Sequence, residues 1–424
     1  MNKVLIISYY FPPMGMGGVQ RTLKFAKYLR DYGWEPVVLT DSPKKYYAVD
    51  MSLLNEAFDC GIKIERTGEE ITDASKIVTT APNERMRRML SRGAQFVLIP
   101  DNKKFWKKKA LKKADEIWEK YGGFNIVFAT APPYTDFLVG QEIKKKYKIP
   151  LVIDYRDAWV DSPVLNYYPT PFHKMSNMRL EKGVLKDANR IITTNRRVKE
   201  LIISRYQNID YNEVKIIPHG FDSEDFEKAA NTELPIKSKM RFTYAGSFYT
   251  RNPKFYLEGI SKFFIKYPEL KREVEFCFIG VVSKDFMALI KNLDIEDGVH
   301  ITGYLDHIDC IRFLLASDVL FLMISRGEND DAAMPGKIGE YIGSRKNIIA
   351  CVPEGVTKKM LEKYDAVTFT EEDPVELMDT FYKYYQLYKS GRLPIANEEM
   401  IQQFDRKELT YDLAKELNLL VDIE

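Results

Sequence analysis

Charged side chains stand directly after a short apolar run near the middle of the sequence, and loops in such positions commonly carry an enzyme's chemistry. Asp154, Arg156 and Asp157 follow the run Leu151–Ile153. A carboxylate there can orient a hydroxyl group or accept its proton, and the other interpretation is an Arg–Asp pair that braces a loop. Trp159 and further aromatic residues come next, and their rings form either a platform for a sugar or ordinary core.

A second set of residues suits phosphate and ribose. Gly246 and Ser247 follow another apolar run and lead to Arg251, just before a helical segment, where a guanidinium and free N–H groups favour a phosphate. Lys337 and Glu340 lie near the beginning of a further helical segment, at a spacing that puts them on one helix face. A lysine for phosphate and a carboxylate for a ribose diol fit there, although this spacing is also common in plain surface ion pairs.

A glycine-rich loop follows the first apolar run. Gly15, Gly17 and Gly18 precede a helical segment, and glycines in such a place let backbone N–H groups approach a phosphate. Asp41, about twenty residues beyond the loop, invites a dinucleotide-binding interpretation. Gln20 occupies the place of the third glycine of that fingerprint. Another phosphate or sugar contact is therefore favoured over a dinucleotide site or a purely structural turn.

These residues must be positioned by the alternation of strands and helices along the chain. Short apolar runs recur, and most of them are followed by residues with helical spacing. The alternation predicts parallel sheets with helices on both faces, and the length favours two sheets over one. Strands are predicted at Val4–Ser8, Pro36–Thr40, Phe124–Ala129, Pro150–Asp154, Arg190–Thr194, Met240–Ala245, Val274–Gly280, Val299–Thr302, Val319–Met323, Asn347–Cys351 and Ala366–Phe369.

The predicted fold class is α/β, with two Rossmann-like doubly wound domains that face a central cleft. A Pro/Gly turn at Ile217–Asp222 marks the seam between them. The predicted parts are a first domain over residues 1–220, a second domain over 221–400, and a C-terminal helix over 401–424 that could pack back on the first domain.

Composition excludes several classes of protein. The chain has 424 residues, of which 45% are hydrophobic and 29% charged, as in globular proteins. No apolar run reaches the roughly 18–20 residues of a membrane helix, and the N-terminus does not resemble a signal peptide. Four dispersed cysteines exclude a zinc framework and argue against disulfides, which predicts a cytoplasmic protein.

Charge is divided unevenly along the chain. Residues 1–222 carry 37 Lys and Arg against 26 Asp and Glu, whereas residues 223–424 carry 26 against 35. A basic half favours anionic surfaces such as membranes or phosphates. The plain alternative is that the two halves attract each other.

Taken together, these segments resemble a retaining glycosyltransferase of family four, with the two-domain fold type called GT-B, over nearly the whole chain. Each segment is weak evidence alone, whereas their order and spacing are specific. The segments are Gly17–Arg21, Ala131–Thr135, Asp154–Trp159, Ile217–Asp222, Gly246–Pro253 and Pro335–Tyr341.

The resemblance implies a hexosyltransferase-type enzyme, in which the domain over residues 1–220 binds the acceptor and the domain over 221–400 binds the nucleotide sugar. It would move a sugar, with retention of configuration, from a nucleotide sugar of the UDP or GDP type to a glycan, lipid-linked or small-molecule acceptor. It would serve bacterial surface polysaccharide or glycoconjugate synthesis, with no metal, no cofactor and no nucleic-acid partner. The implied donor-binding residues are Gly17, Gly18, Gly246, Ser247, Arg251, Lys337 and Glu340; the catalytic residues are Asp157, Arg251 and Lys337; the acceptor-binding residues are Arg21, Asp154, Arg156 and Trp159.

The sequence departs from the family pattern at three positions. Ala332 stands where many relatives carry a Glu eight residues before the ribose Glu, and His219 where many have Asn. Asp157 stands in a region where many relatives place a His. Two alternatives therefore stay open: a non-catalytic scaffold that binds nucleotide sugars, for which Ala332 speaks, and a Rossmann oxidoreductase, which would leave Arg251, Lys337 and Glu340 without a task.

Residues 85–113 are the candidate membrane surface. Residues 103–113 hold seven lysines, with apolar residues between and beyond them at helical spacing. Residues 85–92 interleave arginines with apolar side chains in a similar way. Basic and aromatic faces suit the anionic inner face of a cell membrane, on which the protein would be peripheral. The alternative is an ordinary domain helix whose lysines are solvated.

Overall fold

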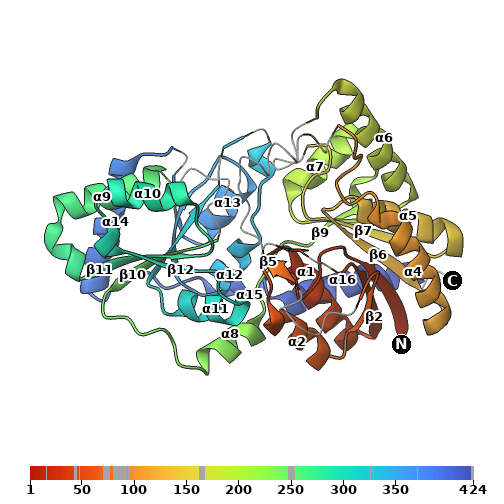
Figure 1. Cartoon of the computed structure of the whole chain (residues 1–424), viewed down its shortest axis with the longest axis horizontal. Helices are drawn as coiled ribbons and strands as arrows, with labels where there is room; N and C mark the ends of the chain where they lie inside the picture. Colours follow the sequence, from red (N-terminus) through yellow and green to blue (C-terminus); the bar gives the residue numbers. More distant parts are fainter. Residues whose placement is uncertain are drawn as a thin grey trace. The chain divides into compact units, whose positions relative to one another are not determined.

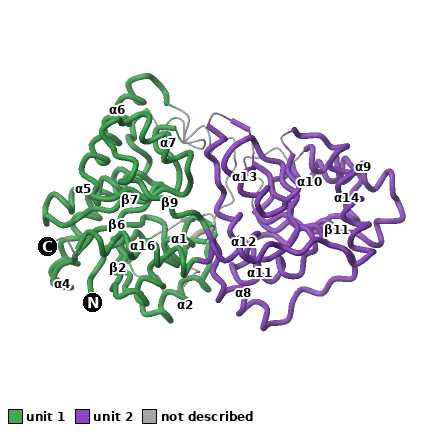
Figure 2. The backbone as a smooth tube through the Cα atoms, turned by 180° about the vertical axis from the view of Figure 1, so that it is seen from behind, with its two compact units in different colours: residues 1–219, 406–424 green, residues 220–405 purple. Residues whose placement is uncertain are grey.

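The computed structural model of the chain divides into two compact units (Figures 1 and 2). Unit 1 comprises Met1–His219 and Arg406–Glu424, and unit 2 comprises Gly220–Asp405. Within them, the structure describes residues 1–15, 17–42, 45–46, 48–69, 77–79, 93, 96–161, 168–246, 254–324, 326–327, 329–369 and 371–421.

Unit 1 contains a seven-stranded parallel sheet with the strand order β4-β2-β1-β6-β7-β8-β9. Its central strands are apolar because helices cover both faces. The strands are β1 (Asn2–Ile7), β2 (Trp34–Thr40), β4 (Lys63–Arg66), β6 (Ile126–Ala131), β7 (Leu151–Tyr155), β8 (Arg190–Thr193) and β9 (Val214–Ile216); β3 (Lys45–Tyr46) and β5 (Val78–Thr79) pair separately. The helices are α1 (Gly17–Tyr28), α2 (Met51–Asp59), α4 (Trp106–Tyr121), α5 (Thr135–Tyr147), α6 (Pro171–Asp187), α7 (Arg196–Arg205) and α16 (Arg406–Val421).

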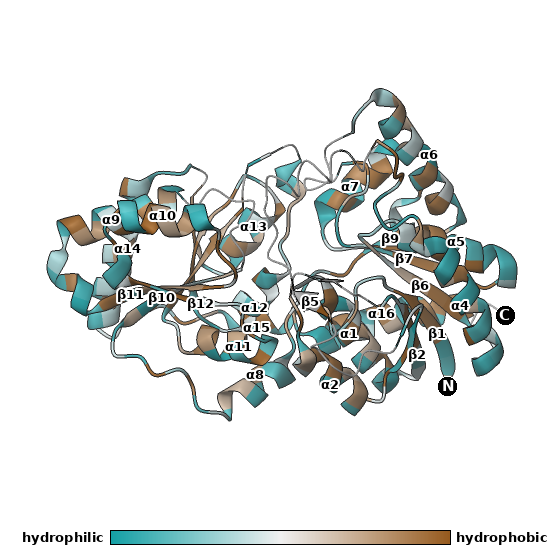
Figure 3. Ribbon diagram, viewed as in Figure 1, coloured by the Kyte–Doolittle hydropathy of each residue, from teal (hydrophilic) through white to brown (hydrophobic). Residues whose placement is uncertain are grey.

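Unit 2 contains a six-stranded parallel sheet with the order β12-β11-β10-β13-β14-β15. In both units the strands are largely hydrophobic, and the helices around them combine hydrophobic and hydrophilic stretches (Figure 3). The strands are β10 (Met240–Ala245), β11 (Val274–Ile279), β12 (Val299–Gly303), β13 (Val319–Met323), β14 (Asn347–Cys351) and β15 (Val367–Phe369). The helices are α8 (Ser223–Ala230), α9 (Lys254–Lys266), α10 (Lys284–Asn292), α11 (His307–Leu315), α12 (Lys337–Gly343), α13 (Val356–Lys363), α14 (Pro374–Lys389) and α15 (Glu398–Gln402).

Strand order determines where each unit offers a ligand site. In unit 1 the chain reverses its direction of winding between β1 and β6, and in unit 2 between β10 and β13. Ligands of open parallel sheets bind beyond the carboxyl ends of the strands at such a reversal. The fold therefore brings the loops after β1, β6 and β7 to one edge in unit 1, and the loop after β10 to the corresponding edge in unit 2. The predicted architecture of two Rossmann-like doubly wound domains is confirmed.

The C-terminal helix α16 belongs to unit 1. Leu413 is fully buried in the same core as β1, and Trp34 Nε1 donates a hydrogen bond to Asn418 Oδ1 at 2.9 Å. The unit boundary lies at Asp405/Arg406 rather than at the predicted 400/401. Ile401 packs in a core of unit 2, and the Phe221 N–H donates to the Phe404 carbonyl, so this short segment is held by unit 2.

Glu181 on α6 makes the stability of unit 1 dependent on pH. Its side chain is buried, and Tyr206 donates a hydrogen bond to Oε2 at 2.8 Å. Burial raises the pKa of Glu181 from the ordinary 4.5 to about 7. The pKa in the folded protein exceeds that in the unfolded chain, so the folded state is favoured when Glu181 is protonated. The stability that protonation contributes is full below about pH 4.5 and is lost as the pH rises through 7.

We therefore expect Glu181→Gln to be more stable than wild type at pH 8, by on the order of 3 kcal/mol in the free energy of unfolding. The advantage should shrink at pH 4.5. Urea unfolding at the two pH values measures both effects. Glu119→Gln, at an exposed position of α4, is the control and should change little. Equal stabilities of Glu181→Gln and wild type at pH 8 would contradict the assignment.

Candidate active site

Tyr341 fastens helix α12 to the sheet of unit 2. Its buried hydroxyl accepts a hydrogen bond from the Ala245 N–H at 2.8 Å and donates one to the Phe321 carbonyl at 3.0 Å. These bonds join α12 to β10 and β13, the two strands at the reversal. The first turn of α12, which carries Lys337 and Glu340, is thereby held near the carboxyl end of β10.

Lys337 lies directly beside the end of β10. Its Nζ donates a hydrogen bond to the Ala245 carbonyl at 2.7 Å and lies 3.7 Å from the centroid of the Tyr244 ring. Gly246 has a φ of +137°, and a Cβ at this residue would lie 2.9 Å from Lys337 Nζ. Gly246 therefore serves both the backbone conformation and the space that the ammonium group needs.

Glu340 lies one helical turn beyond Lys337, with a side chain that is 20% exposed. Its Oε1 lies 3.7 Å from Nδ1 of His307, and Nε2 of that ring lies 3.1 Å from Oδ2 of Asp225. The predicted donor residues Gly246, Lys337 and Glu340 are thus gathered in unit 2. Ser247 and Arg251 lie outside the described residues, so their predicted roles stay predictions.

Gly17 and Gly18 form the first two residues of α1 and are both exposed. A Cβ at Gly17 would meet no heavy atom within 4 Å, and the first turn holds no acidic side chain. The open N-terminus of this helix is a favourable place for an anionic group. The phosphate contact of Gly17 and Gly18 stays a prediction.

Arg156 cross-links the three loops at the edge of unit 1. Its guanidinium donates to the carbonyls of Gly18 and Pro132, and its Nε donates to the Ala131 carbonyl at 3.2 Å. The side chain is only 9% exposed. These contacts give Arg156 a structural task, since they fix the glycine loop against the turn after β6.

Arg21 and Asp154, both expected to bind acceptor, form a buried pair. The two side chains are 1% and 0% exposed, and Arg21 Nη2 lies 2.8 Å from Asp154 Oδ1. Arg21 also donates to the carbonyls of Ile217 and Pro218, and Thr130 donates to Asp154. Their contacts favour a bracing role, which was the other interpretation of an Arg–Asp pair.

Trp159 is also buried and belongs to the core. Its ring is 1% exposed and stacks on Tyr134 with the centroids 4.7 Å apart, and Nε1 donates to Asn177 Oδ1 at 3.0 Å. The ring therefore offers no face to a sugar. Of the two interpretations of this aromatic ring, a platform for a sugar and a part of the core, the structure favours the core.

Asp157 differs from its neighbours because its side chain remains half-buried at the surface. Burial raises the pKa of its carboxyl, and the Arg156 guanidinium beside it opposes that rise. A raised pKa brings a carboxylate closer to what a general base needs at neutral pH. Asp157 is thus the predicted acidic group of this segment that is not fully buried, and its catalytic role stays a prediction.

His307, Asp225 and Tyr341 are site residues that the sequence analysis did not identify. No local signal marks His307, because its partners lie on α8 and α12, far along the chain. Tyr341 stands within the Pro335–Tyr341 segment, but its contacts with β10 and β13 required the fold.

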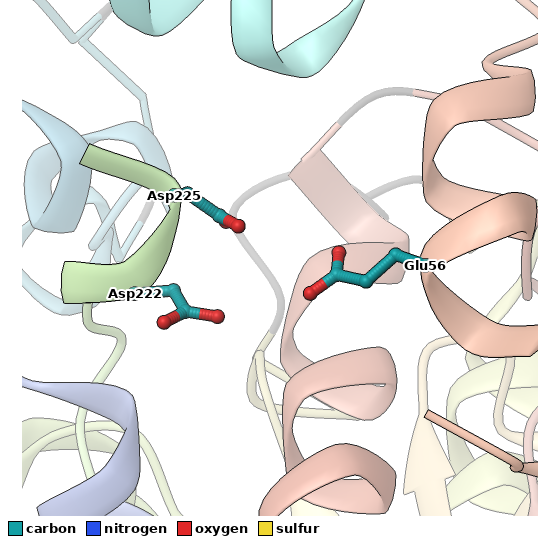
Figure 4. A group of neighbouring side chains, drawn as sticks. All are labelled: Glu56, Asp222 and Asp225. Atoms are coloured by element: carbon teal, nitrogen blue, oxygen red, sulfur yellow. The ribbon is translucent and has the colours of Figure 1, made fainter. Parts of the chain in front are cut away.

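Figure 4 labels three carboxylates, of which Asp222 and Asp225 belong to unit 2 and Glu56 belongs to unit 1. Glu56 projects from α2 of unit 1, whereas Asp222 and Asp225 stand at the beginning of α8 in unit 2. Each has a protein partner within its own unit: Lys24 Nζ lies 2.6 Å from Glu56, Asp222 accepts from the Glu224 N–H, and Asp225 contacts His307. Each carboxylate therefore has a partner within its own unit, and the absence of a metal stays a prediction.

The chain is similar in sequence to one known family of proteins. Residues 16–225 match the model of the family described as Glycosyltransferase Family 4. In sequence, no curated protein matches the chain. Within the described part of the chain, no helix combines the length and the apolar character that crossing a membrane requires.

Solved structures share the fold over almost the whole chain. A glycosyltransferase from Rickettsia africae is 15% identical with a TM-score of 0.63, over 100% of this chain and 99% of that one. HepE of Anabaena in complex with UDP and glucose is 15% identical with a TM-score of 0.63, over 99% and 100%. Sucrose-phosphate synthase from Thermosynechococcus elongatus is 14% identical with a TM-score of 0.64, over 100% of both chains. The family match in the N-terminal half and the fold of both units identify the chain as a glycosyltransferase of family four with the GT-B fold type.

Proposed function

We propose that this glycosyltransferase takes a hexose from a nucleoside-diphosphate sugar that is bound by unit 2. The observation that carries the proposal is the arrangement of Gly246, Lys337 and Glu340 at the carboxyl end of β10. The cation fits a diphosphate, and the carboxylate fits the two hydroxyls of a ribose. The complexes of Anabaena HepE with UDP and with UDP-glucose favour a uridine nucleotide, and GDP is the other candidate.

The chemistry that we propose follows from charge. Cleavage of a sugar–phosphate bond leaves negative charge on the departing diphosphate while the sugar becomes oxocarbenium-like. Lys337, and Arg251 as predicted, would stabilise the diphosphate, since fixed cations stabilise developing charge in a pocket that water has left. We propose retention of configuration through attack on the same face, in which the departing phosphate can take the acceptor's proton.

Unit 1 is the proposed acceptor side. Asp157 is the proposed base or orienting group for the acceptor hydroxyl, and the exposed Gly17 and Gly18 at the start of α1 would approach the departing phosphate. The acceptor that we propose is a glycan or a lipid-linked sugar of bacterial surface glycoconjugate synthesis. Metal independence is part of the proposal, because Lys337 and Arg251 supply the charge that a metal would otherwise provide.

A thermal-shift screen with UDP-, GDP-, ADP- and dTDP-sugars tests the proposal. A ligand that binds only the folded state raises stability by RT ln(1 + [L]/Kd), about 2.7 kcal/mol at a hundredfold excess over Kd. We expect one nucleotide class to raise the Tm of wild type and to fail with Glu340→Ala. Absence of any shift, together with no release of nucleotide in the presence of acceptor extracts, would overturn the proposal.

The scaffold alternative rests on Ala332. This residue is buried at 5% exposure in the turn before α12, at the position where the family pattern in the sequence analysis has a Glu. Nucleotide binding without any sugar transfer or hydrolysis would favour the scaffold.

We further propose that the protein associates with a membrane surface. The apolar stripe of α4 is used by its own unit, because Trp106, Ala110, Ala114 and Ile117 are buried. A membrane contact must therefore use the outer lysines and nearby exposed aromatic side chains, of which Phe105 is 74% exposed. Residues 85–92 lie outside the described part of the chain.

We expect the wild type to bind vesicles that contain anionic lipid. A triple variant in which Lys108, Lys109 and Lys112 are each replaced by Glu should lose this binding. These lysines are exposed and have no ion-pair partner among the described residues. Each contributes about 1 kcal/mol near an anionic surface, and salt should weaken the binding steeply. Flotation with liposomes measures it. Glu substitutions at three exposed lysines of unit 2, Lys262, Lys359 and Lys363, provide the matched control. Equal flotation of both triple variants would leave only the solvated-helix interpretation.

A further inference from the structure

We propose that His307, fixed by Asp225, is a positioning residue that orients the Glu340 carboxylate toward the ribose of the donor. The inference rests on the proposed function, in which Glu340 binds the ribose. It adds a residue for which neither the sequence pattern nor the family match provides a role.

The three side chains come from three helices of unit 2. His307 begins α11, Asp225 lies in the first turn of α8, and Glu340 lies in the first turn of α12. His307 Nε2 is 3.1 Å from Asp225 Oδ2, and Nδ1 is 3.7 Å from Glu340 Oε1. The exposed fractions are 2% for Asp225, 10% for His307 and 20% for Glu340. Burial thus decreases from the anchoring carboxylate to the one that we expect to meet ligand.

Close packing holds this arrangement rigid. A Cβ at Gly339 would overlap the backbone of Gly220, so α12 approaches the Gly220–Asp222 turn as closely as backbone permits. Asp222 caps α8 by accepting a hydrogen bond from the Glu224 N–H at 3.1 Å. The turn therefore connects the helix of Glu340 to the helix of Asp225, and a shift of one side chain relative to the other is costly.

The two distances assign different tasks to the two ring nitrogens. The contact of Nε2 with Asp225 is a hydrogen bond, and it fixes the orientation of the ring. The contact of Nδ1 with Glu340 is longer than a hydrogen bond, so it confines the carboxylate without using its acceptor sites. Both carboxylate oxygens then remain able to accept hydrogen bonds from the 2′- and 3′-hydroxyls of a ribose.

This arrangement resembles the way in which buried partners orient metal-binding or catalytic side chains from behind. A merely structural His307 would brace α8 against α11, and its loss would lower the stability of unit 2. A positioning His307 would instead change affinity for nucleotides that contain the ribose diol. The two roles are separable by experiment.

The experiment measures binding of UDP and GDP to wild type, His307→Ala, Glu340→Ala and the double variant by calorimetry, with Tm recorded for each. We expect Glu340→Ala to weaken binding about tenfold or more and His307→Ala to weaken it by roughly three- to tenfold. The double variant should bind no more weakly than Glu340→Ala alone, because His307 acts through that carboxylate.

Further variants and ligands sharpen the result. Asp225→Asn should reproduce part of the His307→Ala effect, and His307→Gln, which keeps a donor toward Asp225, should restore part of the affinity. With 2′-deoxy-UDP, the difference between wild type and His307→Ala should largely disappear. His300→Ala, at an exposed histidine of β12, should bind as wild type does.

Each outcome decides a different claim. Unchanged nucleotide binding in Glu340→Ala overturns the donor assignment of the proposed function. A loss in Glu340→Ala together with wild-type binding in His307→Ala and His307→Gln overturns the positioning role alone. Additive losses in the double variant, or a fall in Tm in place of a loss of affinity, show a structural role for His307 and also overturn the inference.

Discussion

Asp154→Ala should destabilise unit 1 by roughly 3–5 kcal/mol, the cost of leaving a buried charge without its partner. The partner is Arg21, whose side chain is 1% exposed and donates three hydrogen bonds to the carboxylate. Loss of Asp154 also leaves Thr130 without its acceptor. Urea or thermal unfolding of the variant measures the change, and a loss of this size exceeds what most single substitutions cause.

A double variant separates the pair from the rest of the core. Arg21→Met combined with Asp154→Leu removes both charges and replaces them with apolar side chains, so we expect it to be more stable than either single variant. Asp412→Ala, at an exposed ion pair with Lys415, should cost below about 1 kcal/mol and provides the control. If Asp154→Ala has the same free energy of unfolding as wild type but a lower activity, the result would support the prediction that Asp154 binds the acceptor.

Much of the fold could be predicted because buried parallel strands are continuous apolar runs. The strands Met240–Ala245, Val319–Met323 and Asn347–Cys351 have the bounds that the sequence analysis gave them. The edge strand Lys63–Arg66 was not predicted, because three of its four residues are charged. A strand at the edge of a sheet is only partly covered and does not need an apolar pattern.

The candidate site was harder to predict because local sequence does not reveal burial. Arg21 and Asp154 are 133 positions apart, and no spacing rule pairs residues at such a separation. Trp159 follows charged residues and precedes prolines, as an exposed platform would, yet its ring stacks on Tyr134 in the core. That Lys337 and Glu340 share one helix could be predicted, because a helix places residues three apart on one face regardless of the rest of the fold.

The separation of roles in the Asp154–Trp159 segment has a single physical cause. Asp154 is still within strand β7 and Trp159 points into the core, whereas Asp157 lies in the loop between them. Arg156 lies in the same loop but is held by the carbonyls of Gly18, Ala131 and Pro132, so Asp157 is the least tightly packed of these residues. The sequence alone left Asp154, Arg156, Asp157 and Trp159 as candidates, and of these only Asp157 is not buried, so its role stays a prediction.

The largest expected effect on activity is that of Lys337. We expect Lys337→Met to lower kcat/KM by roughly ten- to a hundredfold, since a hydrogen bond to a charged partner contributes about 1.5–3 kcal/mol. Methionine retains much of the side-chain length beside Tyr244 while removing the charge, so the fold should persist. A loss confined to KM would indicate that Lys337 binds the ground-state diphosphate, and a loss in kcat that it stabilises the charge which develops on the departing group.

The control is a lysine in the same unit that stands away from the carboxyl edge of the sheet. Lys346 directly precedes β14, at the amino end of that strand, and it is half-buried like Lys337. Lys346→Met should leave kcat/KM within about twofold of wild type, because no ligand is expected beyond the amino ends of parallel strands. Lys337→Arg keeps the charge, but the larger guanidinium must fit into the narrow space beside Gly246. We therefore expect an intermediate activity. Wild-type kinetics in Lys337→Met would remove the donor site from this edge of unit 2, and with it the main support for nucleotide-sugar binding there.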